Sequence, residues 1–155
     1  MNSTTQGQSQ MHMSLTLKMG NTLENQHIDH KVFVKTLIVD DSTVIRKILA
    51  YICEEAGLET TTAEDGEKGL ELLITQGPFQ LLLVDWEMPN LNGLDMVRRI
   101  KDENLVPGLK ILMITTHNTM GDVVTAMSLG IDDYLMKPID EESVVARLQA
   151  LGMID

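Results

Sequence analysis

Three acidic residues stand at the ends of two short apolar runs in this sequence. Asp40 and Asp41 follow the run that ends at Val39, and Asp85 follows the run that ends at Val84. Carboxylate oxygens are ligands that Mg²⁺ prefers, and a divalent cation would offset the repulsion between three clustered acids. A carboxylate can also attack phosphorus and form an aspartyl phosphate. These residue types therefore indicate a Mg²⁺ site suited to phosphoryl chemistry.

A hydroxyl group and a cation follow two later apolar runs. Thr115 comes after the run that ends at Ile114, and Lys137 comes after the run that ends at Met136. A phosphoryl group in transfer carries negative charge on its equatorial oxygens, so a site for it needs positive charge and hydrogen-bond donors. Lys137 and the Thr115 hydroxyl would supply these beside Mg²⁺. Any one of the residues could instead cap a helix or hydrate a loop, so the prediction depends on the whole set.

The apolar pattern predicts the elements that position these residues. Short apolar or β-branched runs predict strands at residues 35–39, 58–63, 80–84, 110–114 and 133–136, separated by segments with helical spacing. Such βα units, joined by right-handed crossovers, wind into an open parallel sheet with helices on both faces. Ligands of these α/β folds bind beyond the carboxyl ends of the strands, where the strand order reverses. The three acids, Thr115 and Lys137 all fall at those ends.

The segments between the strands are expected to form helices. Ser42 can cap the first helix and Gly57 can end it. Its inward face is predicted to carry an apolar stripe made of Val44, Ile45, Ile48, Leu49, Ile52 and Cys53. The second helix, residues 65–75, is predicted to turn three side chains inward, namely Leu70, Leu73 and Ile74. The remaining helices are expected around residues 94–100, 123–127 and 141–151.

Composition excludes several classes of protein. A formal net charge of −11 with no basic run argues against direct binding of nucleic acid. The single cysteine, Cys53, cannot form an intramolecular disulfide or a thiolate metal site, which favours a cytoplasmic location. No apolar stretch is long enough to insert into a membrane. Few aromatic residues and 11 methionines predict an aliphatic core containing methionine.

The first 31 residues differ from the rest, because Asn, Ser, Thr, Gln and Gly dominate them. This composition predicts a disordered N-terminal tail, followed by one domain over residues 32–155. Apolar residues nevertheless alternate within the tail at Met11, Met13, Leu15, Leu17 and Met19. That alternation leaves a second interpretation open, in which the segment adds a strand to the sheet edge or binds a partner.

Four motifs, in their order and spacing, resemble those of the receiver domains of two-component response regulators. They are LIVDDS at 37–42, VDWEMPNLNGLD at 84–95, ILMITT at 111–116 and YLMKP at 134–138. The resemblance covers roughly residues 35–151, and the four motifs together are highly specific. It implies a CheY-like, flavodoxin-like (βα)5 domain, with an α/β doubly wound parallel sheet and strand order 2-1-3-4-5.

The resemblance also implies a role for each site residue. Asp85 matches the phosphoacceptor, and Asp40 and Asp41 match the acids that hold Mg²⁺ together with Asp85 and the backbone carbonyl of Trp86. Thr115 and Tyr134 match the two side chains that move when the domain is switched. Lys137 matches the cation that pairs with the phosphoryl group, and it precedes Pro138 at a peptide bond that is usually cis in this family.

Two further positions are expected to tune the lifetime of the phosphoryl group. Glu87 and His117 stand two residues after the phosphoacceptor and the switch threonine, where the family controls access of water. A solvated loop acid and a surface histidine are equally good interpretations of these two residues. Thr116 and Asn92 depart from the residues most frequent at their positions, which puts turnover in question but not the family resemblance.

The favoured function is a stand-alone receiver. A sensor histidine kinase or phosphotransfer protein would donate the phosphoryl group, and a downstream protein would bind the face made by the fourth helix, fifth strand and fifth helix. Such a domain is not a conventional enzyme, although it would catalyse its own phosphorylation and autodephosphorylation. A phosphorylation-independent interaction module is an alternative, but such proteins have usually lost an acid or the lysine. A Mg²⁺-dependent aspartyl-phosphate phosphohydrolase is a further one, in which Glu87 would stand in the place of the general acid.

Overall fold

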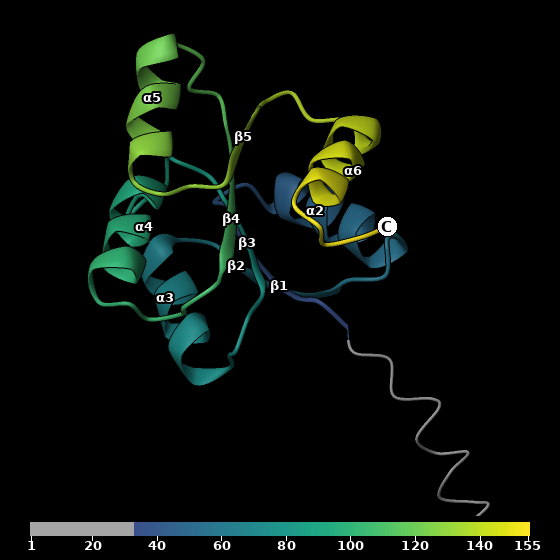
Figure 1. The fold of residues 1–155 in the computed structure, drawn as a ribbon, viewed down its shortest axis with the longest axis horizontal. Coiled ribbons are helices and arrows are strands. Elements are labelled where there is room, and N and C mark those ends of the chain that lie inside the picture. Colours follow the sequence, from purple (N-terminus) through teal and green to yellow (C-terminus); the bar gives the residue numbers. More distant parts are fainter. Residues whose placement is uncertain (1–32) are drawn as a thin grey trace, which may run out of the picture. The chain divides into compact units, whose positions relative to one another are not determined.

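Residues 33–155 are described by a computed structural model and contain five strands and five helices, labelled as in Figure 1. The strands are β1 (Lys35–Val39), β2 (Glu59–Ala63), β3 (Leu81–Val84), β4 (Lys110–Thr115) and β5 (Asp133–Met136). The helices are α2 (Thr43–Glu55), α3 (Gly66–Thr75), α4 (Gly93–Asp102), α5 (Met120–Ser128) and α6 (Glu141–Ala150). The predictions of a disordered tail over residues 1–31 and of an added strand at 11–19 lie outside the described residues.

All five strands form one parallel sheet in the order β2-β1-β3-β4-β5, as expected from the family resemblance. In the register between β1 and β3, Val39 pairs with Val84, so the residues that follow these strands emerge side by side. On the other side of β3, Val84 pairs with Met113 of β4. The strand order therefore brings the carboxyl ends of β1, β3 and β4 next to one another.

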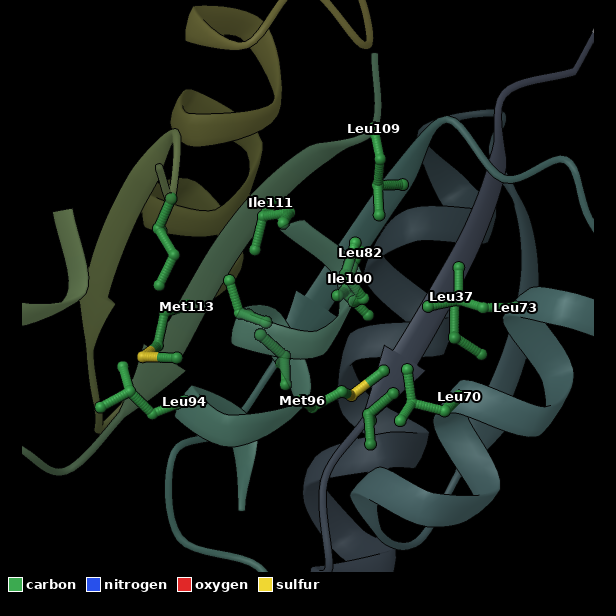
Figure 2. Packing of buried hydrophobic residues seen from close by; sticks show 14 of the residues in the cluster. Leu37, Leu70, Leu73, Leu82, Leu94, Met96, Ile100, Leu109, Ile111 and Met113 are labelled. Atoms are coloured by element: carbon green, nitrogen blue, oxygen red, sulfur yellow. The ribbon is translucent and has the colours of Figure 1, made fainter. Parts of the chain in front are cut away.

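Helices cover both faces of the sheet. Helices α3, α4 and α5 lie on one face, and α2 and α6 lie on the other (Figure 1). Because side chains alternate along a strand, Leu37 and Val39 of β1 pack in the core beneath α3, α4 and α5, whereas Ile38 packs in the core beneath α2 and α6. Figure 2 shows the packing of the first of these cores, which includes the fully buried Met96 and Met113. The predicted aliphatic core with methionine is confirmed.

The predicted inward faces of two helices are wrong at three positions. Val44 and Ile48 of α2 are 65% and 41% exposed, and Ile74 of α3 is 62% exposed. The other four residues of the predicted α2 stripe do pack inward, with Leu49, Ile52 and Cys53 buried and Ile45 partly buried. An apolar side chain on the flank of a surface helix continues the helical spacing without facing the core.

Local signals set the ends of α2 as the sequence predicts. Ser42 caps the helix, since its hydroxyl oxygen accepts a hydrogen bond from the Ile45 N–H at 3.3 Å. Gly57 follows the helix with a φ of 91°, a left-handed conformation that favours glycine. None of the helices in residues 33–155 combines the length and the apolar character needed to cross a lipid bilayer.

Candidate functional site

The three predicted acids meet at the carboxyl edge of the sheet. One carboxylate oxygen from each of Asp40, Asp41 and Asp85 lies within 4.8 Å of those of the other two. Asp40 is 1% exposed and Asp85 is 6% exposed, whereas Asp41 is open to solvent. The site therefore combines two buried carboxylates with one that solvent can reach.

Lys137 joins the two buried acids. Its ammonium donates hydrogen bonds to Asp40 Oδ2 at 2.9 Å and to Asp85 Oδ2 at 3.1 Å. Its backbone N–H donates to the Thr115 carbonyl at 2.8 Å, which ties the segment after β5 to the end of β4. The Lys137–Pro138 peptide bond is cis, as the resemblance implies. The lysine thus reaches from the edge of the sheet across to the acids near its centre.

Burial and charge oppose each other at this cluster. Burial raises the pKa of Asp85 above its ordinary value, although the nearby Lys137 cation acts in the opposite direction. Burial also tends to lower the pKa of Lys137, but the hydrogen bonds and charges of Asp40 and Asp85 outweigh it and raise that pKa. Lys137 is therefore protonated at neutral pH, and its single positive charge balances only part of the negative charge of Asp40, Asp41 and Asp85.

The donor set fits a hard divalent cation. All three side chains offer carboxylate oxygens, which Mg²⁺ prefers, and Asp41 leaves the site accessible from solvent. Asp40 is held in place because its Oδ1 accepts a hydrogen bond from the Ser42 N–H at 2.9 Å. The carbonyl oxygen of Trp86 accepts a hydrogen bond from the Gly93 N–H at 2.8 Å. That bond uses one lone pair of the carbonyl, so its expected role as a metal ligand stays a prediction.

Trp86, Glu87 and His117 form a contact cluster between the segments that follow β3 and β4. The rings of Trp86 and His117 are stacked with centroids 4.2 Å apart. Glu87 Oε1 and His117 Nε2 are 2.6 Å apart, and His117 Nδ1 lies 3.5 Å from Asp122 Oδ2. Glu87 and His117, both predicted to tune the lifetime of the phosphoryl group, are therefore in direct contact.

The two predicted switch residues both contact the backbone of His117. The buried Thr115 hydroxyl accepts a hydrogen bond from the His117 N–H at 3.3 Å. The Tyr134 hydroxyl donates to the His117 carbonyl at 2.7 Å, and its ring is buried. Burial raises the pKa of Tyr134 to about 12, so this hydroxyl remains a donor across the physiological range. Thr115 and Tyr134 are thus linked through the backbone of one residue, His117.

One polar pair beside the site was not found by sequence reasoning. Asp65 caps α3 and also accepts a hydrogen bond from the side chain of Asn90, which lies between Asp85 and α4. The capping preference of Asp at a helix start was a usable signal for Asp65. Nothing in the sequence pattern connects it to Asn90, which is 25 residues away.

A flavodoxin-like sheet of order 2-1-3-4-5 with three acids, a threonine and a lysine at its carboxyl edge defines the class of receiver domains. A sequence profile of the family described as "Response regulator receiver domain" matches residues 36–149. The chain therefore belongs to the response regulator receiver family.

The chain is similar in sequence and structure to several named proteins. Chemotaxis protein CheY1 of Helicobacter pylori is 33% identical over 119 residues, which are 76% of this chain and 96% of that protein. The phosphate regulon regulatory protein PhoB of Pseudomonas aeruginosa is 34% identical over 115 residues, which are 74% of this chain and 50% of that protein. The solved structure of Vibrio cholerae chemotaxis protein CheY4 has a TM-score of 0.72 and 28% identity, and the match covers 77% of this chain and 99% of that chain.

Proposed function

We propose that this protein accepts a phosphoryl group on Asp85 from a histidine kinase or phosphotransfer protein and passes the signal to a protein partner. The observation that carries the proposal is the arrangement around Asp85. A nucleophilic carboxylate, 6% exposed, lies beside two further acids and 3.1 Å from a lysine ammonium. A purely structural site would have no reason to accept the repulsion of three acids whose oxygens lie within 4.8 Å of one another.

The transfer step uses the side chains in defined roles. A carboxylate oxygen of Asp85 forms a bond to phosphorus while the bond between phosphorus and the donor's imidazole nitrogen breaks. The electron pair of that bond returns to the imidazole, which then takes a proton from solvent. Lys137 carries positive charge to the phosphoryl oxygens, and the Thr115 hydroxyl can turn toward them when it leaves the His117 N–H.

Asp40, Asp41 and Asp85 would hold Mg²⁺, with the Trp86 carbonyl as the further proposed ligand. When bound, Mg²⁺ would neutralise negative charge on the acids and on the transferring group. The solvent exposure of Asp41 leaves a route for the ion to enter. Ser42 keeps Asp40 in one orientation through its backbone N–H, so that acid is prearranged for binding.

Removal of the phosphoryl group returns the domain to its starting state. Water attacks phosphorus, the bond to Asp85 breaks, and inorganic phosphate leaves. Glu87 and His117 are proposed to govern the approach of that water. The protein would then catalyse only its own phosphorylation and autodephosphorylation, which differs from a conventional enzyme with a separate substrate.

The proposed output face consists of α5, β5 and α6, the fourth helix, fifth strand and fifth helix of the sequence-based prediction. Four large apolar side chains are exposed there on α5 and β5, namely Met120, Val124, Met127 and Met136. Methionine is flexible and polarizable, which suits a surface that binds another protein. Tyr134 lies on β5 and contacts His117, so this face is connected to the segment that follows β4.

The proposed boundaries are a receiver over residues 32–155 and a separate polar segment over residues 1–31. Among the relatives, proteins named for chemotaxis and for transcriptional regulation match at similar identity, so the proposal extends to no particular process. The net charge of −11 favours a protein partner over nucleic acid. The buried thiol of Cys53, whose pKa is raised to about 12 by burial, is compatible with the cytoplasmic location that we propose.

The fluorescence of Trp86, the single tryptophan of the chain, tests the proposal directly. We expect Mg²⁺ to change the emission, and a small phosphodonor or beryllofluoride to change it further only in the presence of Mg²⁺. Asp85→Asn should abolish the second change. Asp102→Asn is the matched control, because Asp102 is an exposed acid at the end of α4 and should leave both responses intact.

Two outcomes would contradict the proposal. If Mg²⁺ and phosphodonor leave the emission of the wild type unchanged, the acids are not a working metal site and a phosphorylation-independent interaction module becomes the better interpretation. If the protein instead turns over phosphate esters many times per site, it is a phosphohydrolase.

A further inference from the structure

Asp65 forms two different kinds of contact with its two carboxylate oxygens. Its Oδ1 accepts a hydrogen bond from the Lys68 N–H at 2.9 Å, which caps α3. Its Oδ2 accepts a hydrogen bond from the side-chain amide of Asn90 at 3.0 Å. Asp65 is 4% exposed, and these hydrogen bonds hold its pKa below the ordinary value, with the Lys68 N–H as the largest cause. The side chain is therefore ionised and fully engaged at neutral pH.

The segment that Asn90 belongs to starts at Asp85 and is closely packed against α3. The Gly66 N–H donates to the Leu91 carbonyl at 3.2 Å. A Cβ atom at Gly66 would lie 2.3 Å from that carbonyl oxygen, so only glycine allows this approach. Asn90 itself has a φ of 68°, a left-handed conformation that asparagine adopts more readily than most residues.

A second anchor holds the same segment at its other end. The Gly93 N–H donates to the Trp86 carbonyl at 2.8 Å, and Asn92 caps α4 by accepting from the Asp95 N–H at 2.9 Å. The residues between Asp85 and α4 are therefore fixed at two places, by their own backbone near Trp86 and by α3 near Asn90. Among the contacts with α3 near Asn90, only the bond between Asp65 and Asn90 is charge-assisted.

We infer that Asp65 is a positioning residue of the phosphoacceptor site: through Asn90 it holds the segment that carries Trp86 and Glu87 in the conformation needed beside Asp85. Asp65 does not itself touch the reacting atoms. The functional consequence of this inference, weaker Mg²⁺ binding by a loosened segment, rests on the proposed function. Its structural part, the restraint of residues 86–92 by Asp65, can be measured without metal.

The Asp65→Asn substitution separates the two contacts. The remaining carbonyl oxygen of the asparagine can still cap α3, since Asn and Asp are about equally good at this position. Its amide cannot accept a hydrogen bond, so the charge-assisted contact with Asn90 is lost, and a rotated Asn90 amide can replace it only with a neutral hydrogen bond. We expect faster amide hydrogen exchange of Leu91 and Gly93 in the metal-free protein. We also expect Mg²⁺ alone, followed by Trp86 fluorescence, to bind about fivefold more weakly, the scale on which a charge-assisted hydrogen bond exceeds a neutral one.

A reversed pair and a matched cap make the test specific. In the double variant Asp65→Asn/Asn90→Asp an amide faces a carboxylate again, and exchange and Mg²⁺ affinity should return toward the wild type. Asp140→Asn is the control, because Asp140 caps α6 by accepting from the Ser143 N–H at 2.7 Å and lies in another segment. It should leave both readouts unchanged.

The outcomes distinguish this inference from the proposed function. If Asp65→Asn leaves the exchange of Leu91 and Gly93 as slow as in the wild type, Asp65 is only a helix cap and the inference is wrong. Failure of the reversed pair to recover either readout would also overturn it. If the wild type fails to bind Mg²⁺ while exchange in Asp65→Asn is accelerated, the restraint stands and it is the proposed function that fails.

Discussion

The indole ring of Trp86 lies nearly parallel to the imidazole ring of His117, with 4.2 Å between centroids and 7° between planes. The hydrogen bond between Glu87 and His117 reinforces this stack. Because the backbone of His117 also contacts Thr115 and Tyr134, the ring contacts are connected to the two proposed switch residues. If Thr115 moves toward a phosphoryl group as proposed, we expect the environment of Trp86 to change.

Replacing His117 with alanine should shorten the lifetime of the phosphoryl group on Asp85. The variant loses both the ring that covers Trp86 and the partner of Glu87, so water reaches the site more easily. We expect hydrolysis to be about threefold faster, which corresponds to less than 1 kcal/mol, the scale of an exposed ion pair. Mass spectrometry of the phosphorylated protein over time measures the rate. Asn118→Ala, at an exposed neighbour, is the control, and slower hydrolysis in His117→Ala would show that the histidine orients water instead.

Replacing Lys137 with methionine should destabilise the metal-free protein. Methionine retains most of the aliphatic length but leaves the buried Asp40 and Asp85 carboxylates, now 2.9 and 3.1 Å from the ammonium, without their cation. Breaking such a buried pair from one side typically costs about 3 kcal/mol of unfolding free energy. Urea denaturation at pH 7 measures the loss, and Mg²⁺ should restore part of it. Lys110→Met removes an exposed pair with Asp132 and should cost about 0.5 kcal/mol or less.

The stability of the metal-free protein should depend on pH through Asp85. Its pKa is raised in the folded state, chiefly by burial, so its contribution to stability is fully present below the unfolded value of 3.8 and is lost as pH rises through the folded pKa. Asp85→Asn removes this dependence, because asparagine does not titrate. The variant should gain stability relative to the wild type at neutral pH, and the gain should shrink as pH falls toward 3.8. Urea denaturation of both proteins between pH 4 and 7 tests this, and a gain independent of pH would contradict it.

The site could be predicted from the sequence because each of its residues follows an apolar run. Parallel strands place their carboxyl ends at one edge, so Asp40, Asp85 and Thr115 had to lie close together once the strands were recognised. The pairing of Val39 with Val84 then brings the first two side by side. Periodicity and strand topology were sufficient for this part of the structure.

Contacts between single polar residues could not be predicted in the same way. The bond from Asp65 to Asn90 and the bridge from Glu87 to His117 each join residues in different connecting segments, whose conformations carry no periodic signal. Periodicity also failed to show which flank of a helix the sheet covers, as the exposure of Val44 demonstrates. Such details depend on packing between elements that are distant in the sequence.

Gly93 provides a test of how tightly the backbone after Asp85 must be held. A Cβ atom there would lie 1.9 Å from the Asp85 carbonyl oxygen, and a backbone atom cannot yield as a side chain can. Gly93→Ala should therefore shift the segment after Asp85, lower the unfolding free energy by about 2–3 kcal/mol, and weaken Mg²⁺ binding. Gly121→Ala is the control, since its Cβ would meet only the Thr119 hydroxyl at 3.8 Å and a helical alanine is favourable. Urea denaturation and Mg²⁺ titration of both variants decide the matter, because equal behaviour of the two would mean that the close approach at Gly93 is not needed for the site.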